Sequence, residues 1–210
     1  MSSPWDFGWT QVLTIIGFGI TGTIAIAGFR SFDRWKREKL EEKRIEIALE
    51  ALSLAYEGRE VFELIRNPGS YGHEWADMPG KDKLTEQDWN HRGPFYAITK
   101  RVQDQSPFFD RVAKLRPRFL AVFGTKNEEC FKLIREARAH VFVSAQTLCF
   151  SPPGHLQAAA MQKMECDIWE GIGEGYGIED RVGKKIDQFV TLIEGLCRPI
   201  IDKSYSPKDS

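Results

Sequence analysis

The sequence predicts an all-α protein in which one N-terminal transmembrane helix precedes a cytosolic bundle of four to five long helices. Three observations support this fold class. An uncharged and mostly apolar run extends from Phe7 to Phe29 and stops at Arg30. Beyond it, apolar residues recur at helical spacing, whereas the alternation typical of strands is almost absent. Segments rich in proline and glycine separate the helical patterns.

The apolar run is long enough to cross a bilayer, for which about 20 residues suffice. We therefore predict a transmembrane helix over residues 9–29, preceded by a short extracytoplasmic segment over residues 1–8. A cleaved signal peptide is the competing interpretation, because the tripeptide 25–27 reads Ala-Ile-Ala. A signal peptide also needs a basic start, and no lysine or arginine precedes the run, so a retained anchor is favoured.

The charges that flank the span predict its orientation. Basic residues concentrate in residues 30–39, and positive flanks stay on the cytoplasmic side of a membrane. The N-terminus is therefore expected outside and residues 30–210 inside, with the bundle over residues 30–203, at the inner (plasma) membrane. Trp5, Trp9 and Trp35 lie near the two ends of the span, where indole rings favour the interface.

Small residues form a row within the predicted span. Gly17, Thr21 and Ala25 recur every four residues. Such a row lets two membrane helices approach closely, so it predicts self-association of the span.

Composition limits the partners and cofactors of the cytosolic part. All 29 basic residues follow Phe29, as do all of the 30 acidic residues except Asp6, so this part is formally neutral and nucleic acid is not an expected partner. The four cysteines lack any C-x-x-C spacing and are expected as buried free thiols. Glu136 and His140 lie one helical turn apart, but bundle metal sites need several such ligands. We predict no metal and no cofactor.

Helical periodicity places the elements of the cytosolic part. The first helix is expected to continue from the span to about Arg66, where Asn-Pro-Gly stops it. Further helices are expected over 95–104, 106–124, 125–151, 155–170 and 182–200, followed by a flexible tail over 204–210. Thr125 and Glu128 have the spacing of a capping box. The last helix has the most regular apolar stripe, from Val182 to Ile200.

The long connection predicted over residues 67–94 is the first candidate for a ligand site, because long loops in compact domains are usually functional or disordered. A short helix is expected to begin within it at Thr85. Its side chains suit a polar ligand or acid–base chemistry. The candidate ligand-binding residues are His73, Trp75, Asp77, Trp89 and His91. The alternative is a surface flap pinned by its two tryptophans.

Basic residues beside the span and in residues 100–118 suggest contact with anionic lipid head groups. The candidates are Arg30, Arg34, Lys36, Arg37, Lys114, Arg116 and Arg118. The alternative is an ordinary solvated helix face.

No catalytic motif stands out, so the leading hypothesis is a binding protein rather than an enzyme. The glycine run 171–177 lacks the spacing of a phosphate loop and follows a predicted helix instead of a strand. We expect a non-catalytic adaptor, assembly factor or regulatory subunit at the cytosolic face of the membrane, with the bilayer and a protein partner or second copy as its contacts. One alternative is an enzyme or ligand sensor with its site in residues 67–94. Another is a membrane-acting effector that oligomerises through its span.

Overall fold

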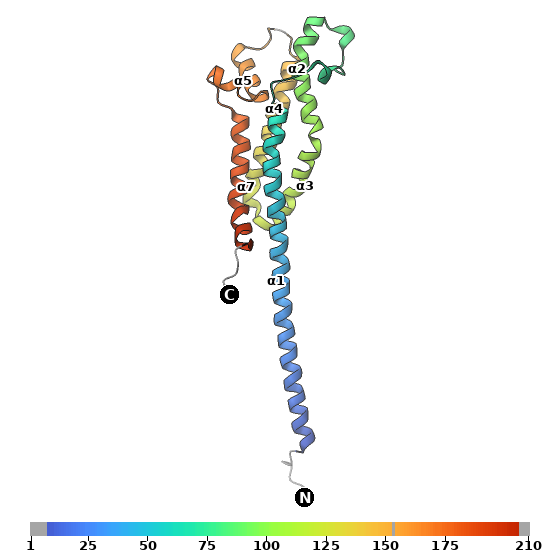
Figure 1. The fold of residues 1–210 in the computed structure, drawn as a ribbon, viewed down its shortest axis with the longest axis vertical. Coiled ribbons are helices and arrows are strands. Elements are labelled where there is room, and N and C mark those ends of the chain that lie inside the picture. The colour runs from blue at the N-terminus through green and yellow to red at the C-terminus, as the bar shows by residue number, and fades with distance from the viewer. Residues whose placement is uncertain (1–7, 153, 206–210) are drawn as a thin grey trace. The chain divides into compact units, whose positions relative to one another are not determined.

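The computed structural model describes residues 8–152 and 154–205, and every regular element within them is helical (Figure 1). The α-helices are α1 (Trp9–Ile65), α2 (Glu86–Asp104), α3 (Ser106–Phe123), α4 (Glu128–Phe150), α5 (Ala158–Ile168), α6 (Ile172–Tyr176) and α7 (Arg181–Tyr205). The 3₁₀ turns are η1 (Gly72–Trp75), η2 (Lys81–Lys83) and η3 (Thr125–Asn127). The all-α prediction is confirmed for these residues. Trp5 and most of the predicted tail lie outside them.

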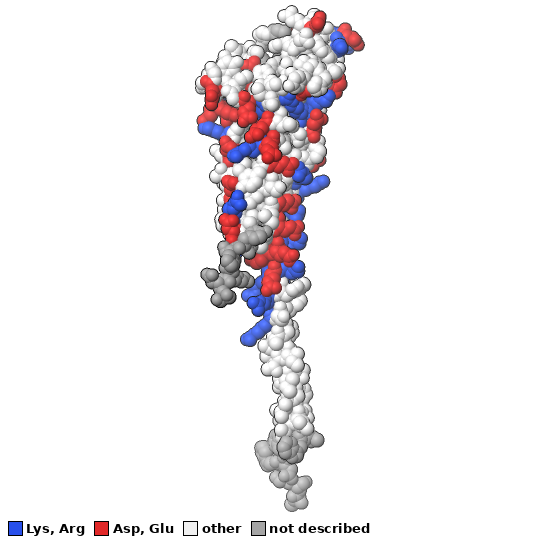
Figure 2. All heavy atoms as spheres, in the orientation of Figure 1, with Lys and Arg blue, Asp and Glu red and all other residues white. Residues whose placement is uncertain are grey.

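The chain divides into two compact units, Met1–Arg44 and Ile45–Ser210. In the described residues of the first unit, the apolar side chains of α1 are exposed, with Leu13 at 63% and Phe18 at 76%. One described helix is long and apolar enough to cross a membrane by length and composition, and it is this one, with a mean hydropathy of 2.0 over 18 residues. Figure 2 shows the same stretch free of charged side chains. α1 ends at Ile65, as the sequence predicts.

In the second unit, ion pairs give the relative directions of the helices. Arg111 and Arg118 of α3 pair with Glu57 and Glu50 of α1, respectively. The α3 number rises by seven while the α1 number falls by seven, so the two helices run antiparallel. The pairs of Arg59 with Asp187 and of Arg66 with Asp180 show the same relation between α1 and α7. Figure 1 shows α2 and α3 running in one direction, with α4 returning beside them.

The apolar stripes that periodicity predicts form most of the core of this unit, although near the end of α7 Cys197 and Ile201 are buried and Ile200 is only partly so. On α7, Val182, Ile186, Phe189 and Ile193 are each at most 5% exposed. Burying one such side chain stabilises the fold by roughly 1.5–3 kcal/mol. The stripe of α4 lies against the same core, from Cys130 to Leu148.

Two helix starts test the predicted caps. The Thr85 hydroxyl accepts the Asp88 N–H at 3.0 Å, so the predicted cap of α2 is present. The capping box predicted at Thr125 is wrong, because these residues form η3 and neither η3 nor α4 has a side-chain cap. The Glu128 carboxylate binds Arg116 at 2.7 Å instead.

The connection after α1 is shorter than the predicted 67–94 segment. α2 begins at Glu86 and continues through Pro94, so Trp89 and His91 lie on a helix rather than in a loop. The Thr85 cap, together with acidic residues in the first turn, supplies the start signal.

Candidate functional site

The segment after α1 is held against α2 by one arginine. The Arg101 guanidinium donates to both carboxylate oxygens of Glu74, at 2.8 and 3.0 Å, and to the carbonyls of Asn67 and Gly69. The Arg101 and Glu74 side chains are only 14% and 18% exposed. The hydrogen bond from Arg101 lowers the pKa of Glu74. This fork fixes both ends of the segment from residue 67 to residue 74.

The two tryptophans of this region pack against the domain. A Cβ atom at Gly93 would lie 2.4 Å from the Trp75 ring, so glycine is what lets the indole lie directly on α2. Trp89 packs against the core and carries the Lys81 ammonium 5.6 Å from its ring centroid. Trp75 therefore holds the segment against α2, whereas Trp89 belongs to α2 itself.

The other predicted ligand residues of this region each contact a different neighbour. His73 stacks on Tyr71 with ring centroids 5.8 Å apart, Asp77 pairs with Lys100 at 2.9 Å, and His91 meets Phe95 edge-on at 5.7 Å. Among the described residues, no three histidine, cysteine or acidic side chains come together in a way that could hold a metal ion.

A buried ionic network joins the end of α1 to the segment from α5 to α7, and the sequence did not predict it. Arg66 is 2% exposed. Its Nη1 and Nη2 atoms each donate to one carboxylate oxygen of Asp180, both at 2.9 Å. Nε and Nη2 also donate to the carbonyls of Asp167, at 3.0 Å, and Cys166, at 2.9 Å. A planar guanidinium suits such a fork, which an ammonium group cannot reproduce.

Asp180 belongs both to this network and to the start of α7. Its Oδ1 accepts the backbone N–H groups of Val182, at 3.1 Å, and Gly183, at 2.9 Å, which caps the helix. A Cβ atom at Gly183 would lie 2.6 Å from the Asp180 carboxylate. The glycine is therefore required by this close approach.

Asp167 forms the second half of the network. Its carboxylate is 1% exposed and accepts two hydrogen bonds from Arg181, both at 2.6 Å, and one from the Ser144 hydroxyl at 2.7 Å. The hydrogen bonds that Arg181 donates to Asp167 raise the pKa of Arg181. No buried side-chain polar atom among the described residues lacks a partner. Full satisfaction of this kind is typical of a network that stabilises the fold.

His140 lies among the charges of this network. Burial lowers its pKa most, and the positive charges of Arg181 and Lys185 lower it further, while Asp167 and Glu136 oppose the shift. Glu136 itself binds Lys185 at 2.5 Å.

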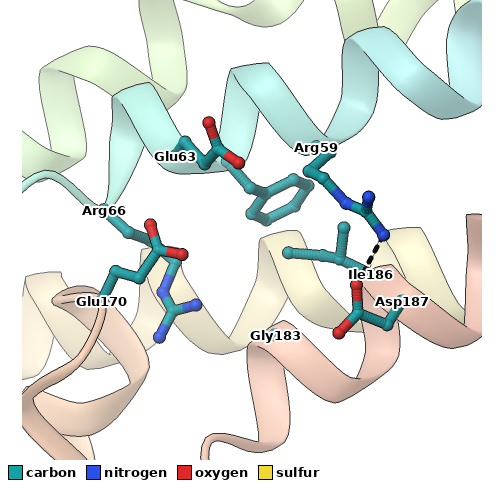
Figure 3. A pocket seen from close by; sticks show the side chains of 8 residues that line it. Arg59, Glu63, Arg66, Glu170, Gly183, Ile186 and Asp187 are labelled. Atoms are coloured by element: carbon teal, nitrogen blue, oxygen red, sulfur yellow. Dashed lines mark hydrogen bonds and ion pairs between the residues drawn. The ribbon is translucent and has the colours of Figure 1, made fainter.

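A polar hollow of about 220 Å³ lies between α1 and α7, beside Arg66 (Figure 3). The Arg59 guanidinium reaches across it to Asp187 at 2.8 Å, the contact drawn as a dashed line. Glu63 and Glu170 also line the hollow. Its two arginines already bind carboxylates, so no free cation faces the space from these positions.

An apolar groove of about 190 Å³ lies between α3 and α4, and we call it the α3–α4 groove. Phe109 and Val112 from α3 and Phe131 and Ile134 from α4 form its apolar lining. Three arginines complete it: Arg116, Arg135 and Arg138. The sequence did not predict this groove; the signal for it is the set of arginines on the same helix faces as the apolar lining.

The predicted lipid-contact residues differ in their surroundings. Arg116 binds Glu128, and Arg118 binds Glu50 at 2.9 Å, so carboxylates already balance both charges. Lys114 is exposed and has no ion pair among the described residues. In the first unit, Arg30, Arg34, Lys36 and Arg37 are all exposed on α1, and Arg34 contacts Glu38 at 3.5 Å.

The small-residue row lies on one exposed stretch of α1. The Thr21 hydroxyl donates to the Gly17 carbonyl at 2.8 Å, so its proton is used within the helix. A Cβ atom at Gly17 would meet nothing within 4 Å. All three residues of the row, Gly17, Thr21 and Ala25, are exposed.

All four cysteines are buried free thiols, which confirms that prediction. Burial raises the pKa of every one of them, that of Cys149 to about 11 and that of Cys197 to about 12.

Comparison of the chain with models of protein families, with curated proteins and with solved structures finds no match.

Proposed function

We propose that the protein is a single-pass membrane protein whose cytosolic helical bundle acts as a non-catalytic adaptor, assembly factor or regulatory subunit. The observation that carries this proposal is the exposed apolar stretch of α1. From Leu13 to Phe29 its large apolar side chains are at least half exposed. Soluble monomers rarely expose a contiguous apolar patch of more than a few hundred Å². A bilayer covers such a helix while its backbone hydrogen bonds stay satisfied internally.

The charges beside this stretch support an orientation with the N-terminus outside and the bundle in the cytoplasm of the inner membrane. Arg30, Lys36 and Arg37 follow the apolar residues directly, while no basic residue precedes them. Positive flanks of this kind stay in the cytoplasm and attract anionic head groups. A C-terminal reporter that a protease reaches in intact spheroplasts would contradict this orientation.

The mechanism is confinement. A domain tethered to a membrane meets other membrane proteins at a raised effective concentration, so a modest interface suffices for assembly. Internal contacts of the second unit support a binding role, since the buried Arg66 binds Asp180 and the Asp167 carbonyl, and the Asp167 carboxylate binds Arg181. A partner would then bind to the surface of the domain rather than to these buried charged groups.

Affinity purification of the full-length chain from native membranes in mild detergent tests the proposal. Mass spectrometry identifies what co-purifies, and mass photometry gives the stoichiometry. A chain lacking residues 1–29 is the control. A stoichiometric second protein that is lost with the anchor would establish an adaptor or subunit. A protein that purifies alone or only with itself would contradict the proposal and favour the ligand sensor or the oligomerising effector.

A further inference from the structure

We propose that the α3–α4 groove binds an acidic amphipathic helix of a protein partner, which inserts one large apolar side chain between the two helices. This inference rests on the proposed function and names the chemistry of the partner. Four observations carry it: the size of the groove, its lining, the placement of its arginines and its length.

The size and lining of the groove suit a single side chain. Its volume of about 190 Å³ falls below the roughly 300–1,000 Å³ typical of pockets that enclose small molecules. The lining side chains of Phe109, Val112, Phe131 and Ile134 are each at most 7% exposed, so the apolar lining is fixed by the core. One aromatic or aliphatic anchor in a preformed pocket is the usual centre of a protein interface.

The arginines lie at both ends of this lining. Arg116 binds Glu128, whereas the Arg138 guanidinium lies 4.4 Å from the Phe109 ring centroid. Since residue 116 meets residue 128 and residue 109 meets residue 138, α3 and α4 run antiparallel. Arg116 is therefore at one end of the groove, and Arg138 is at the other.

The charge of the groove selects an acidic occupant. Arg116 is balanced by Glu128, but within the described part of the chain neither Arg135 nor Arg138 forms an ion pair with a carboxylate. Two positive charges thus remain beside an apolar pocket. Complementary charges at the rim of an interface steer association and select the partner. Acidic side chains flanking an apolar anchor would meet this pattern.

The length of the groove favours a helix. From Phe109 to Arg116, α3 rises about 10 Å, or two turns, at 1.5 Å per residue. A helix bound in a groove presents its apolar anchor side chains at positions i, i+3 or i+4, and i+7. These positions also span about two helical turns. A partner helix that places its apolar anchor centrally can reach the unpaired Arg135 and Arg138 with carboxylates about one turn from the anchor.

A photo-crosslinking amino acid at Ala113 in the full-length chain, expressed in native membranes, tests the site. Ala113 lines the groove and is exposed. Val143, which is 57% exposed and does not line the groove, is the matched control position. We expect Ala113, and not Val143, to crosslink to a partner segment in which acidic residues flank an apolar side chain.

The crosslinked segment is then synthesised, and its affinity for the full-length chain in detergent is measured by fluorescence anisotropy. Reversing both unpaired charges, in R135E/R138E, should weaken binding at least about tenfold, because two attractions become two repulsions. Filling the groove with A113W should have a similar effect without changing charge. R135E alone guards against misfolding of the double variant, and K163E, at an exposed lysine on α5, should change affinity less than about twofold.

Other results would overturn the inference in distinguishable ways. A crosslink from Ala113 to lipid, to a second copy of this chain or to a segment without acidic residues refutes the proposed occupant. A partner that co-purifies with the full chain but crosslinks only elsewhere leaves the adaptor function standing and refutes this groove as its site. If no protein co-purifies at all, the proposed function fails, and this inference fails with it.

Discussion

Replacing Arg66 with methionine should remove a large part of the stability of the second unit. Methionine fills much of the same space but has no donor and no charge. The substitution leaves the Asp180 carboxylate without its cation. It also removes the hydrogen bonds that Arg66 donates to the carbonyls of Asp167 and Cys166. The perturbation therefore acts on one guanidinium that joins α1 to the segment from α5 to α7.

The magnitude follows from burial. Removing one partner of a buried ion pair costs about 3–5 kcal/mol, out of a typical folding stability of about 5–15 kcal/mol. Asp180 is 35% exposed, so water can solvate part of its carboxylate. We therefore expect R66M to lose about 3 kcal/mol, the lower end of that range. R66K keeps the charge but cannot form the fork, and its loss should be intermediate.

Denaturant titration of the full-length chain in detergent, followed by tryptophan fluorescence, measures these losses. Trp169 is a suitable reporter, because it packs against the core and its carbonyl accepts from Arg66 at 3.4 Å. R59M is the matched control. It removes an exposed ion pair with Asp187 on the same two helices, and such pairs contribute about 0.2–1 kcal/mol. If R66M loses no more stability than R59M, the network is not what holds these helices together.

Three further tests probe other contacts in the full-length chain. G183A should destabilise α7, because its new methyl group would collide with the Asp180 carboxylate that caps the helix. G195A has open space around it and should stabilise the same helix by about 0.5–1 kcal/mol. Equal effects of the two variants in denaturant titrations would contradict the close approach of Gly183 to Asp180. The native state holds His140 below its usual pKa of 6.5, so the unfolded chain takes up a proton there that the native chain does not. Stability should therefore fall as pH drops below about 6.5, and H140Q should flatten that slope in titrations between pH 7 and pH 5. If the small-residue row associates, G17I/T21I should abolish the signal in a membrane two-hybrid assay, and an unchanged signal would exclude the row.

Local patterns explain which parts of the fold could be predicted. The apolar stripe from Val182 to Ile193 repeats every three or four residues, and the side chains on it are buried in the structure. The Thr85 cap could be predicted because its donor, the Asp88 N–H, lies three residues away. Both signals lie within one helix, where chain geometry alone brings the residues together.

The ionic network could not be predicted, because its partners are distant in sequence. Arg66 and Asp180 are 114 residues apart. Charged residues are normally assigned to the surface, so a sequence-based prediction would place Arg66, Asp180 and Asp167 in solvent. The available hint is positional: Arg66 directly follows the buried Ile65 at the end of a long apolar stripe.

The basic stretch over residues 100–118 shows a related limit. Summing charges along the chain makes it positive, yet Arg101, Arg111 and Arg118 all bind carboxylates from other segments. Glu57 and Glu50 of α1 supply the partners of Arg111 and Arg118. The two sets of charges meet only when α1 and α3 lie antiparallel, and that arrangement is not visible in the sequence of either helix.

The buried cysteines make this chain a convenient template for site-directed labelling. With a pKa of about 11 for Cys149 and about 12 for Cys197, the thiolate fraction at pH 7 is on the order of 10⁻⁴ and 10⁻⁵, and the thiolate is the form that reacts. Because all four native thiols are buried, maleimide dyes and nitroxide probes should leave them untouched under folded conditions. A single cysteine introduced on the surface would carry the label alone, without first removing the four natural ones. Distances between helices, and between this chain and whatever it binds, then become accessible by spectroscopy.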